Sequence, residues 1–151
     1  MSQIRVIVTN RKARRNYEIL ETLECGIVLT GSEVKAIKAG RVSVEEAYAE
    51  PVRGEIWLKN MHVGEWPGAS HFAHDPLRPR KLLLHARQIK KLIGKVSQRG
   101  LTLIPLKIYL KNGLIKVEIG LARGRRSYEK RDVIKRREIE REIRRELKRH
   151  Y

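Results

Sequence analysis

Residues 101–123 read LTLIPLKIYLKNGLIKVEIGLAR, and this stretch decides the fold. Leu106, Ile108 and Leu110 alternate with polar or amphipathic residues, and the alternation resumes after the pair Asn112–Gly113. A period of two is typical of a strand with one buried face, and Asn-Gly favours a two-residue type I′ turn. The stretch therefore predicts a β-hairpin, with a bulge or sheet corner at Pro105, where the apolar phase slips by one residue.

The same alternation predicts further strands on the N-terminal side of this hairpin. Residues 17–29 form a long strand that bends near Gly26. Residues 46–52 and 55–63 form a second hairpin across Arg53–Gly54. About six strands with such bends favour a small closed β-barrel.

Two short helices are expected to pack on this barrel. One begins at Gly31, where Ser32 can cap the first turn, and ends before Gly40. The other covers residues 86–98, in which apolar side chains recur at helical spacing. Residues 64–80 are rich in Pro, Gly and His, and predict an irregular connection.

The last segment, residues 128–151, differs from everything before it. It is almost entirely charged and carries only a narrow row of apolar residues. Its charge pairs favour a helix, but an isolated helix of this length is marginal in water. We therefore divide the chain into a barrel domain over residues 1–127 and a basic tail over residues 128–151. The tail is expected to be helical or disordered when free, and to fold on its partner.

The charge of the chain is large and unevenly distributed. Thirty-four Lys and Arg residues face 17 Asp and Glu residues, which gives a net charge of +17. Residues 1–17 and 76–117 contain no acid at all. Segregation of this kind indicates an electropositive face, and nucleic acid is the partner it favours, because neutralised phosphates release counterions. An anionic membrane surface is the competing partner.

Other kinds of chemistry find little support. No apolar stretch is long enough to span a bilayer, and the N-terminus does not resemble a secretory signal. Cys25, the single cysteine, lies mid-strand on the apolar face, which suits a small buried hydrophobe in a reducing, cytoplasmic compartment. His71, His74 and Asp75 are close in sequence, but a zinc site needs three or four converging ligands. We expect neither a metal nor a cofactor.

Several segments resemble the small protein B family, the SsrA-binding proteins. The matching segments are residues 10–14 (NRKAR), 24–35 (ECGIVLTGSEVK), 39–42 (AGRV), 74–85 (HDPLRPRKLLLH), 100–107 (GLTLIPLK) and 111–124 (KNGLIKVEIGLARG). Their order and spacing agree along nearly the whole chain. The resemblance implies a mainly β fold: a closed, oligonucleotide-binding-type barrel with about three helices, one of them in a basic C-terminal tail, and no enzymatic activity.

The resemblance also implies a function. Members of the family bind the tRNA-like domain of transfer-messenger RNA and deliver it to the A site of stalled ribosomes for trans-translation. The expected partners are this RNA and the ribosome, whose small-subunit decoding region and empty mRNA channel the tail would probe. We expect a monomer, one copy per RNA, with no membrane partner. The alternatives are an RNA-processing enzyme that uses His74 and Asp75, or a general structural protein of the ribosome.

The matched segments carry over candidate site residues. Asn10, Glu24 and Leu83 fall at positions that the family uses on its RNA surface. Glu24 could instead pair with a neighbouring Arg, and Leu83 could fill the core. The basic residues expected to contact phosphate and sugar are Arg11, Lys12, Arg14, Lys35, Arg78, Arg80 and Lys81. The tail residues expected to contact the ribosome are Tyr128, Lys130, Arg131, Lys135 and Arg136.

Tyr128 stands where many members of the family have histidine. If that ring stacks on a ribosomal base, tyrosine can do the same. If a titrating imidazole matters there, this chain must work differently.

Overall fold

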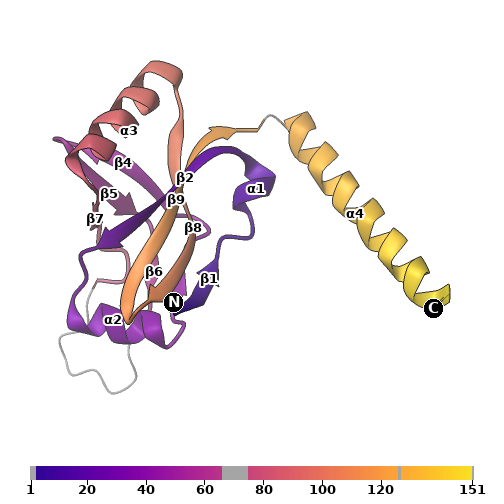
Figure 1. The fold of residues 1–151 in the computed structure, drawn as a ribbon, viewed down its shortest axis with the longest axis horizontal. Coiled ribbons are helices and arrows are strands. Elements are labelled where there is room, and N and C mark those ends of the chain that lie inside the picture. The colour runs from indigo at the N-terminus through magenta and orange to yellow at the C-terminus, as the bar shows by residue number, and fades with distance from the viewer. Residues whose placement is uncertain (1–2, 66–74, 126, 151) are drawn as a thin grey trace.

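The computed structural model describes residues 3–65, 75–125 and 127–150, and only the backbone of residues 98, 99, 127–133, 149 and 150. The strands are β1 (Ile4–Thr9), β2 (Tyr17–Ile27), β3 (Val42–Ser43), β4 (Tyr48–Val52), β5 (Glu55–Lys59), β6 (His62–Val63), β7 (Arg80–Leu83), β8 (Thr102–Lys111) and β9 (Leu114–Gly124). The helices are α1 (Ala13–Asn16), α2 (Gly31–Lys38), α3 (Ala86–Arg99) and α4 (Ser127–His150). Figure 1 shows a curled sheet with α2 and α3 at opposite ends and α4 extending to one side.

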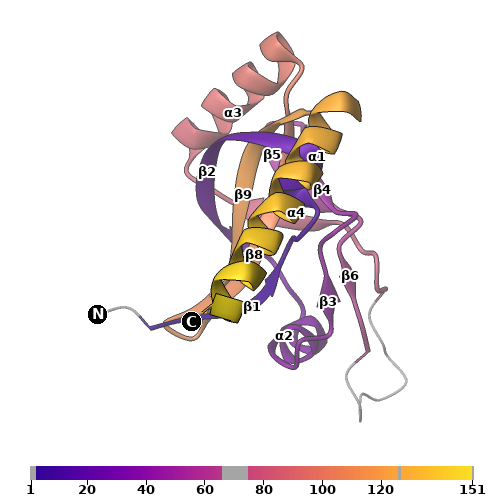
Figure 2. The same cartoon turned by 90° about the vertical axis from the view of Figure 1, so that its right-hand side faces the viewer.

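The sheet closes on itself. Its strands run in the order β8, β4, β5, β7, β2 and β9, and β9 pairs with β8 again, so six strands form a ring. β1 pairs with β8 from outside this ring. β3 and β6 form a separate two-stranded ribbon, visible in Figure 2. The mainly β, closed-barrel prediction is confirmed.

The hairpin of residues 101–123 has the predicted geometry. Asn112 and Gly113 have φ angles of 52° and 80°, as a type I′ turn requires. The register of β8 against β9 shifts between Pro105 and Lys107, which is the predicted bulge. Gly100 ends α3 in the left-handed conformation, also as expected.

The core fills the barrel and both of its ends. Leu103, Ile108 and Val117 from the β8–β9 hairpin are buried in one apolar cluster. Ile37 of α2 and Leu92 of α3 belong to the same cluster. The two helices therefore seal the ends of the barrel, since each turns its apolar stripe inward.

Several local predictions were wrong or incomplete. The strand expected over residues 55–63 is interrupted at Asn60, which has a φ of 60°. The side chain that caps α2 belongs to Thr30, not Ser32, because Thr30 and Glu33 form a reciprocal capping box. β1, α1 and β7 lie in segments for which no regular element was expected.

A buried carboxylate joins α2 to β7. Glu33 and Arg80 are both fully buried, and the Glu33 carboxylate accepts hydrogen bonds of 2.5 Å from Arg80 Nε and from Arg78 Nη2. Arg80 also donates to the carbonyl oxygens of Met61 and Pro76, at 2.7 and 3.2 Å. Each buried charge thus has several partners, which offsets the cost of removing it from water.

The partners of Glu33 also decide its ionisation. Burial alone raises the pKa of the Glu33 carboxyl. The hydrogen bonds from Arg78, the Thr30 N–H and Arg80 outweigh this effect and lower the pKa to about 2. The carboxylate is therefore charged throughout the physiological pH range.

Arg125, just before α4, is hydrogen-bonded to α1 and to the start of β2. The Arg125 N–H donates to the Asn16 carbonyl oxygen at 2.8 Å, and Arg125 Nε donates to the carbonyl oxygens of Arg14 and Tyr17 at 3.2 and 3.3 Å. α4 itself is helical over 24 residues and extends away from the barrel in Figure 1. The exposed row of Ile139, Ile143 and Leu147 follows one face of this helix.

Replacing Glu33→Gln should lower the free energy of unfolding by about 3–5 kcal/mol at pH 7, because Arg80 then remains buried without a counter-charge. The folded pKa of about 2 lies below the ordinary value of 4.5. The stability that ionised Glu33 contributes is therefore fully present above about pH 4.5 and is lost as the pH falls through about 2. Urea unfolding followed by circular dichroism should show the difference between wild type and variant narrowing below pH 4.5.

Glu50→Gln is the matched control for this prediction. Glu50 pairs with Lys59, but its side chain is 41% exposed, so its removal should cost under about 1 kcal/mol. A stability gap between wild type and Glu33→Gln that stays equal from neutral to strongly acidic pH would contradict the assignment.

Candidate nucleic-acid interface

Glu24 lies on the outer face of β2, beside the β8–β9 hairpin. Its Oε2 accepts a 2.5 Å hydrogen bond from the Tyr109 hydroxyl, and Lys111 Nζ lies 3.3 Å from both of its oxygens. The hydrogen bond from Tyr109 is the main reason that the pKa of Glu24 is lowered. Glu24 is thus held as an ionised acceptor on an otherwise basic surface.

Leu83 stands next to this acceptor. It pairs with Gly26 across β7 and β2, and its side chain is 49% exposed. A Cβ added at Gly26 would lie 3.2 Å from the Leu83 Cβ, so the glycine leaves the room that Leu83 occupies. Leu82 is buried and Leu84 packs against the core, so Leu83 is the residue of the 82–84 leucine run that faces solvent rather than filling the core.

Glu24 and Leu83 share one cavity. It has a volume of about 420 Å³ and is also lined by His85 and Gln88 from the start of α3 and by Lys116 from β9. An adjoining apolar groove of about 310 Å³ shares Gly26, Leu83 and Lys116 and continues past Leu114 at the hairpin tip. We call these two hollows together the Glu24–Leu83 pocket. It offers an acceptor, an apolar wall and a cation within one concave site.

Exposed cations lie along the helix next to the pocket. α3 begins beside it and carries Arg87, Lys90 and Lys91 on its solvent face. These residues belong to the acid-free run of residues 76–117. A phosphate chain that leaves the pocket would therefore meet positive charge along α3, which is how nucleic-acid surfaces supply affinity.

Asn10 has a structural role that its sequence position did not reveal. It is 7% exposed, and its Nδ2 donates to the carbonyl oxygens of Val44 and Pro105 at 3.3 and 2.9 Å. Its N–H donates to the Leu106 carbonyl oxygen at 2.7 Å. Asn10 therefore ties the N-terminal segment to the β8 bulge, away from Glu24 and Leu83.

The structure contradicts the expectation that Arg80 contacts phosphate. Its side chain is completely buried against Glu33 and the Met61 carbonyl, so no RNA can reach it in this fold. Arg78 is partly exposed but donates to the same carboxylate. Both arginines organise the segment that presents Leu83.

The other predicted cations lie on the surface, some of them paired with carboxylates. Lys81 pairs with Glu55, and Lys12 lies 3.7 and 3.5 Å from Glu45 and Glu46. Arg11, Arg14 and Lys35 have exposed side chains. In the tail, Lys135 and Arg136 are exposed on α4, whereas the side chains of Tyr128, Lys130 and Arg131 lie outside the described residues.

Two neighbours of Glu24, Tyr109 and Lys116, could not be recognised from the sequence. Tyr109 falls on the side of β8 shared with Lys107 and Lys111, which predicts an exposed ring, yet it is only 4% exposed. Lys116 looked like any other outward lysine of β9. Only the pairing of β9 with both β2 and β8 brings either residue next to Glu24.

Other chemistry finds no site where the chain is described. Over residues 3–65, 75–125 and 127–150, no group of three or more His, Cys, Asp or Glu side chains could hold a metal ion. His71 and His74 lie outside those ranges. Burial raises the pKa of Cys25 to about 12, so its thiol stays protonated and does not serve as a nucleophile. Within the same ranges, no helix is long and apolar enough to cross a membrane.

A closed six-stranded barrel with an acceptor-bearing pocket in a basic surface defines a small oligonucleotide-binding-type protein. The sequence model of the family described as SmpB protein matches residues 7–149. The chain therefore belongs to the SmpB family, and the resemblance in its sequence segments is confirmed.

Individual relatives agree. An SsrA-binding protein of Thermosynechococcus vestitus is 53% identical over 146 residues, which cover 96% of each chain. An SsrA-binding protein of Limosilactobacillus fermentum is 50% identical over 146 residues, covering 97% of this chain and 92% of the relative. A solved structure described as "tmRNA-SmpB: a journey to the center of the bacterial ribosome" superposes with a TM-score of 0.67 at 45% identity, covering 84% of this chain and 93% of that one.

Replacing Tyr109→Phe should raise the pKa of Glu24 towards 4.5, because it removes the hydrogen bond that contributes most to the lowered value. A carbon-detected NMR titration of the Glu24 carboxyl measures this directly. Lys116→Gln is the control: it removes only the weakest contribution and should shift the pKa far less. An unchanged Glu24 pKa in the Tyr109→Phe variant would refute the role given to the phenol.

Proposed function

We propose that this protein binds transfer-messenger RNA and brings it to stalled ribosomes for trans-translation. The observation that carries the proposal is the Glu24–Leu83 pocket in the basic surface of the barrel. The name SsrA-binding protein, borne by relatives at about half identity over nearly the whole length, supports it. With the ribosome as a partner, the protein would act in the cytoplasm.

The pocket suits a nucleotide of a structured RNA that is not base-paired. The Glu24 carboxylate accepts a hydrogen bond from a base amino group or a 2′-hydroxyl, and Leu83 packs against the exposed base. Lys116 and the cations of α3 balance the phosphates on either side. Specificity then comes from the pocket and affinity from the surrounding charge. No covalent step is needed, and we assign the protein no catalytic residue.

The remaining candidate residues divide by accessibility. Arg11, Arg14 and Lys35 are exposed and available for phosphate. Lys12 and Lys81 can exchange their surface carboxylates for phosphate oxygens, because such exposed pairs contribute little energy.

The tail, residues 128–151, acts in this proposal as the ribosome-contacting part. α4 combines exposed cations, Lys135 and Arg136 among them, with the narrow apolar row, a combination that suits a groove lined with RNA. An mRNA channel admits such a helix only when no message fills it. The tail would therefore make rescue conditional on an empty channel, with the barrel carrying the transfer-messenger RNA.

Glu24→Ala and Leu83→Ala should each weaken binding of transfer-messenger RNA by about tenfold, because each removes one base-directed contact worth roughly 1–3 kcal/mol. Filter binding at a fixed salt concentration measures this. Glu50→Ala, which removes a surface carboxylate on β4 that does not line the pocket, should leave the affinity within about twofold. If both pocket variants bind as tightly as wild type, the pocket is not the RNA site.

Deleting residues 128–151 should leave the affinity for free transfer-messenger RNA within about threefold, since the pocket and α3 remain. The same deletion should abolish peptide tagging on a message without a stop codon in a reconstituted translation system. Tagging at the wild-type level by the truncated protein would remove the proposed role of the tail.

A further inference from the structure

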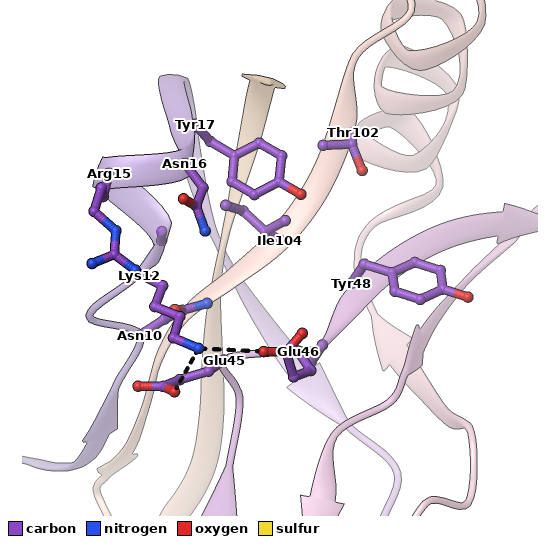
Figure 3. Close-up of a pocket in the computed structure, with 12 residues that line it drawn as sticks. Asn10, Lys12, Arg15, Asn16, Tyr17, Glu45, Glu46, Tyr48, Thr102 and Ile104 are labelled. Carbon is purple, nitrogen blue, oxygen red and sulfur yellow. Dashed lines mark hydrogen bonds and ion pairs between the residues drawn. The ribbon is translucent and has the colours of Figure 1, made fainter. Parts of the chain in front are cut away.

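A second pocket lies at the other end of β2. It is lined by residues of α1, of the segment before β4 and of β8, and has a volume of about 340 Å³. Tyr17, at the start of β2, lines it, and Glu24 lies seven residues further along the strand. At about 3.3 Å per residue the two sites are separated by up to ~23 Å. Figure 3 shows the ring of Tyr17 on the opposite side of this pocket from Glu45 and Glu46. We call it the Tyr17 pocket.

The wall of the Tyr17 pocket contains a buried acceptor that lacks a donor. Both hydrogen bonds of the Asn10 side chain are made by Nδ2, which fixes the amide orientation. Its Oδ1 is buried and has no hydrogen-bond partner among the described residues. A buried polar atom in this state costs free energy unless a donor from outside supplies the missing bond. Asn10 therefore contributes an unsatisfied polar atom to the wall, just behind its solvent-accessible surface.

The Tyr17 pocket is lined by charges of both signs, unlike a simple phosphate site. Lys12 and Arg15 line it, but so do Glu45 and Glu46, and Lys12 is within 3.7 Å of both carboxylates. Two carboxylates repel a phosphate, yet they accept hydrogen bonds from sugar hydroxyls and base amino groups. The polar wall thus matches the sugar and base of a ribonucleotide, with Arg15 left for the flanking phosphate.

Tyr17 supplies an aromatic surface for that base. The ring is half-buried and packs against the small cluster of Ala13, Ile104, Leu106 and Ala122, which holds it in place. The part of the ring that stays exposed faces the pocket. Aromatic rings fixed in this way are the usual stacking platforms for unpaired bases.

We propose that the Tyr17 pocket binds one unpaired ribonucleotide whose base carries an exocyclic amino group. This inference rests on the proposed RNA-binding function and adds a second nucleotide site to it, distinct from the Glu24–Leu83 pocket. The base stacks on Tyr17, its amino group donates to the Glu46 carboxylate, and the 2′-hydroxyl donates to the Glu45 carboxylate. Cytosine, adenine and guanine meet these demands, whereas uracil presents a carbonyl where cytosine presents an amino group.

Three short oligonucleotides of equal length and equal charge test the proposal with the full-length protein. They are hexacytidylate, hexauridylate and the 2′-deoxy form of hexacytidylate. NMR titrations would follow the side-chain amide of Asn10 and the ring of Tyr17. Hexacytidylate should bind about fivefold more tightly than either of the other two, the range expected for one hydrogen bond. Equal affinities for all three, or shifts confined to exposed lysines and arginines, would mean phosphate attraction alone and would overturn the proposal.

Variants distinguish the loss of base stacking on Tyr17 from a disturbance of the fold. Tyr17→Leu should weaken hexacytidylate binding about tenfold, while Tyr17→Phe, which keeps the ring, should stay within about twofold of wild type. Because Tyr17→Leu also perturbs packing, Glu46→Gln provides a second measurement: its side chain is 80% exposed, so the fold is unaffected. Glu46→Gln should reduce the preference for cytosine over uracil, and an unchanged preference together with an inert Tyr17→Leu would exclude the site.

The same titrations in the Glu24→Ala variant distinguish this inference from the proposed function. If hexacytidylate keeps its preference there, the two nucleotide sites are independent. If transfer-messenger RNA binding depends on Glu24 but the oligonucleotides show no preference, only the Tyr17 pocket is refuted. If the preference is found but transfer-messenger RNA is not bound, the proposed function fails and the pocket stands.

Discussion

The buried ion pair between Glu33 and Arg80 determines how β7 presents its side chains. Side chains of a strand alternate between faces, so the inward position of Arg80 fixes the faces of the whole of β7. Leu82 follows it into the core, and Lys81 and Leu83 turn outward. A residue that looks like a phosphate ligand in the sequence is therefore the reason that a leucine is displayed to solvent. The charge of Arg80 is neutralised by Glu33 inside the protein. Arg80 therefore affects recognition only by fixing the position of Leu83.

The closed barrel also makes one strand serve two sites. β2 carries Tyr17 at its start and Glu24 near its end, and it pairs with β9 along most of its length. Because β9 is locked to β8 in the same ring, the separation of the two side chains is fixed by the sheet. An RNA that engages both ends must match that spacing. Shape, and not charge alone, then enters the recognition of a folded RNA.

Periodicity predicted the parts of the fold in which apolar alternation is strong. The 101–123 hairpin, β2 and α3 came from the residues alone, and Glu24 and Leu83 came from resemblance to a family. Alternation could not find β1, because Val6, Ile7 and Val8 are consecutive apolar residues without a period of two. Nor could it distinguish Thr30 from Ser32 as the residue that caps α2. It also could not show that Arg80 is buried, because a buried cation depends on a partner 47 positions away. Tyr109 was missed for the same reason, since its partner comes from another strand.

The attachment of Arg125 to α1 limits how far from the barrel the C-terminal helix can reach. A helix of 24 residues is about 36 Å long at about 1.5 Å per residue. Arg125, two positions before its first residue, makes three hydrogen bonds to carbonyl oxygens of the barrel domain. While the helix is intact, its far end therefore lies within that length of the residue at which the helix begins. Inserting or removing a single residue near the root would turn every later side chain by about 100°. The length of α4 and the direction in which its side chains face, as well as its charge, thus determine which surface it can contact.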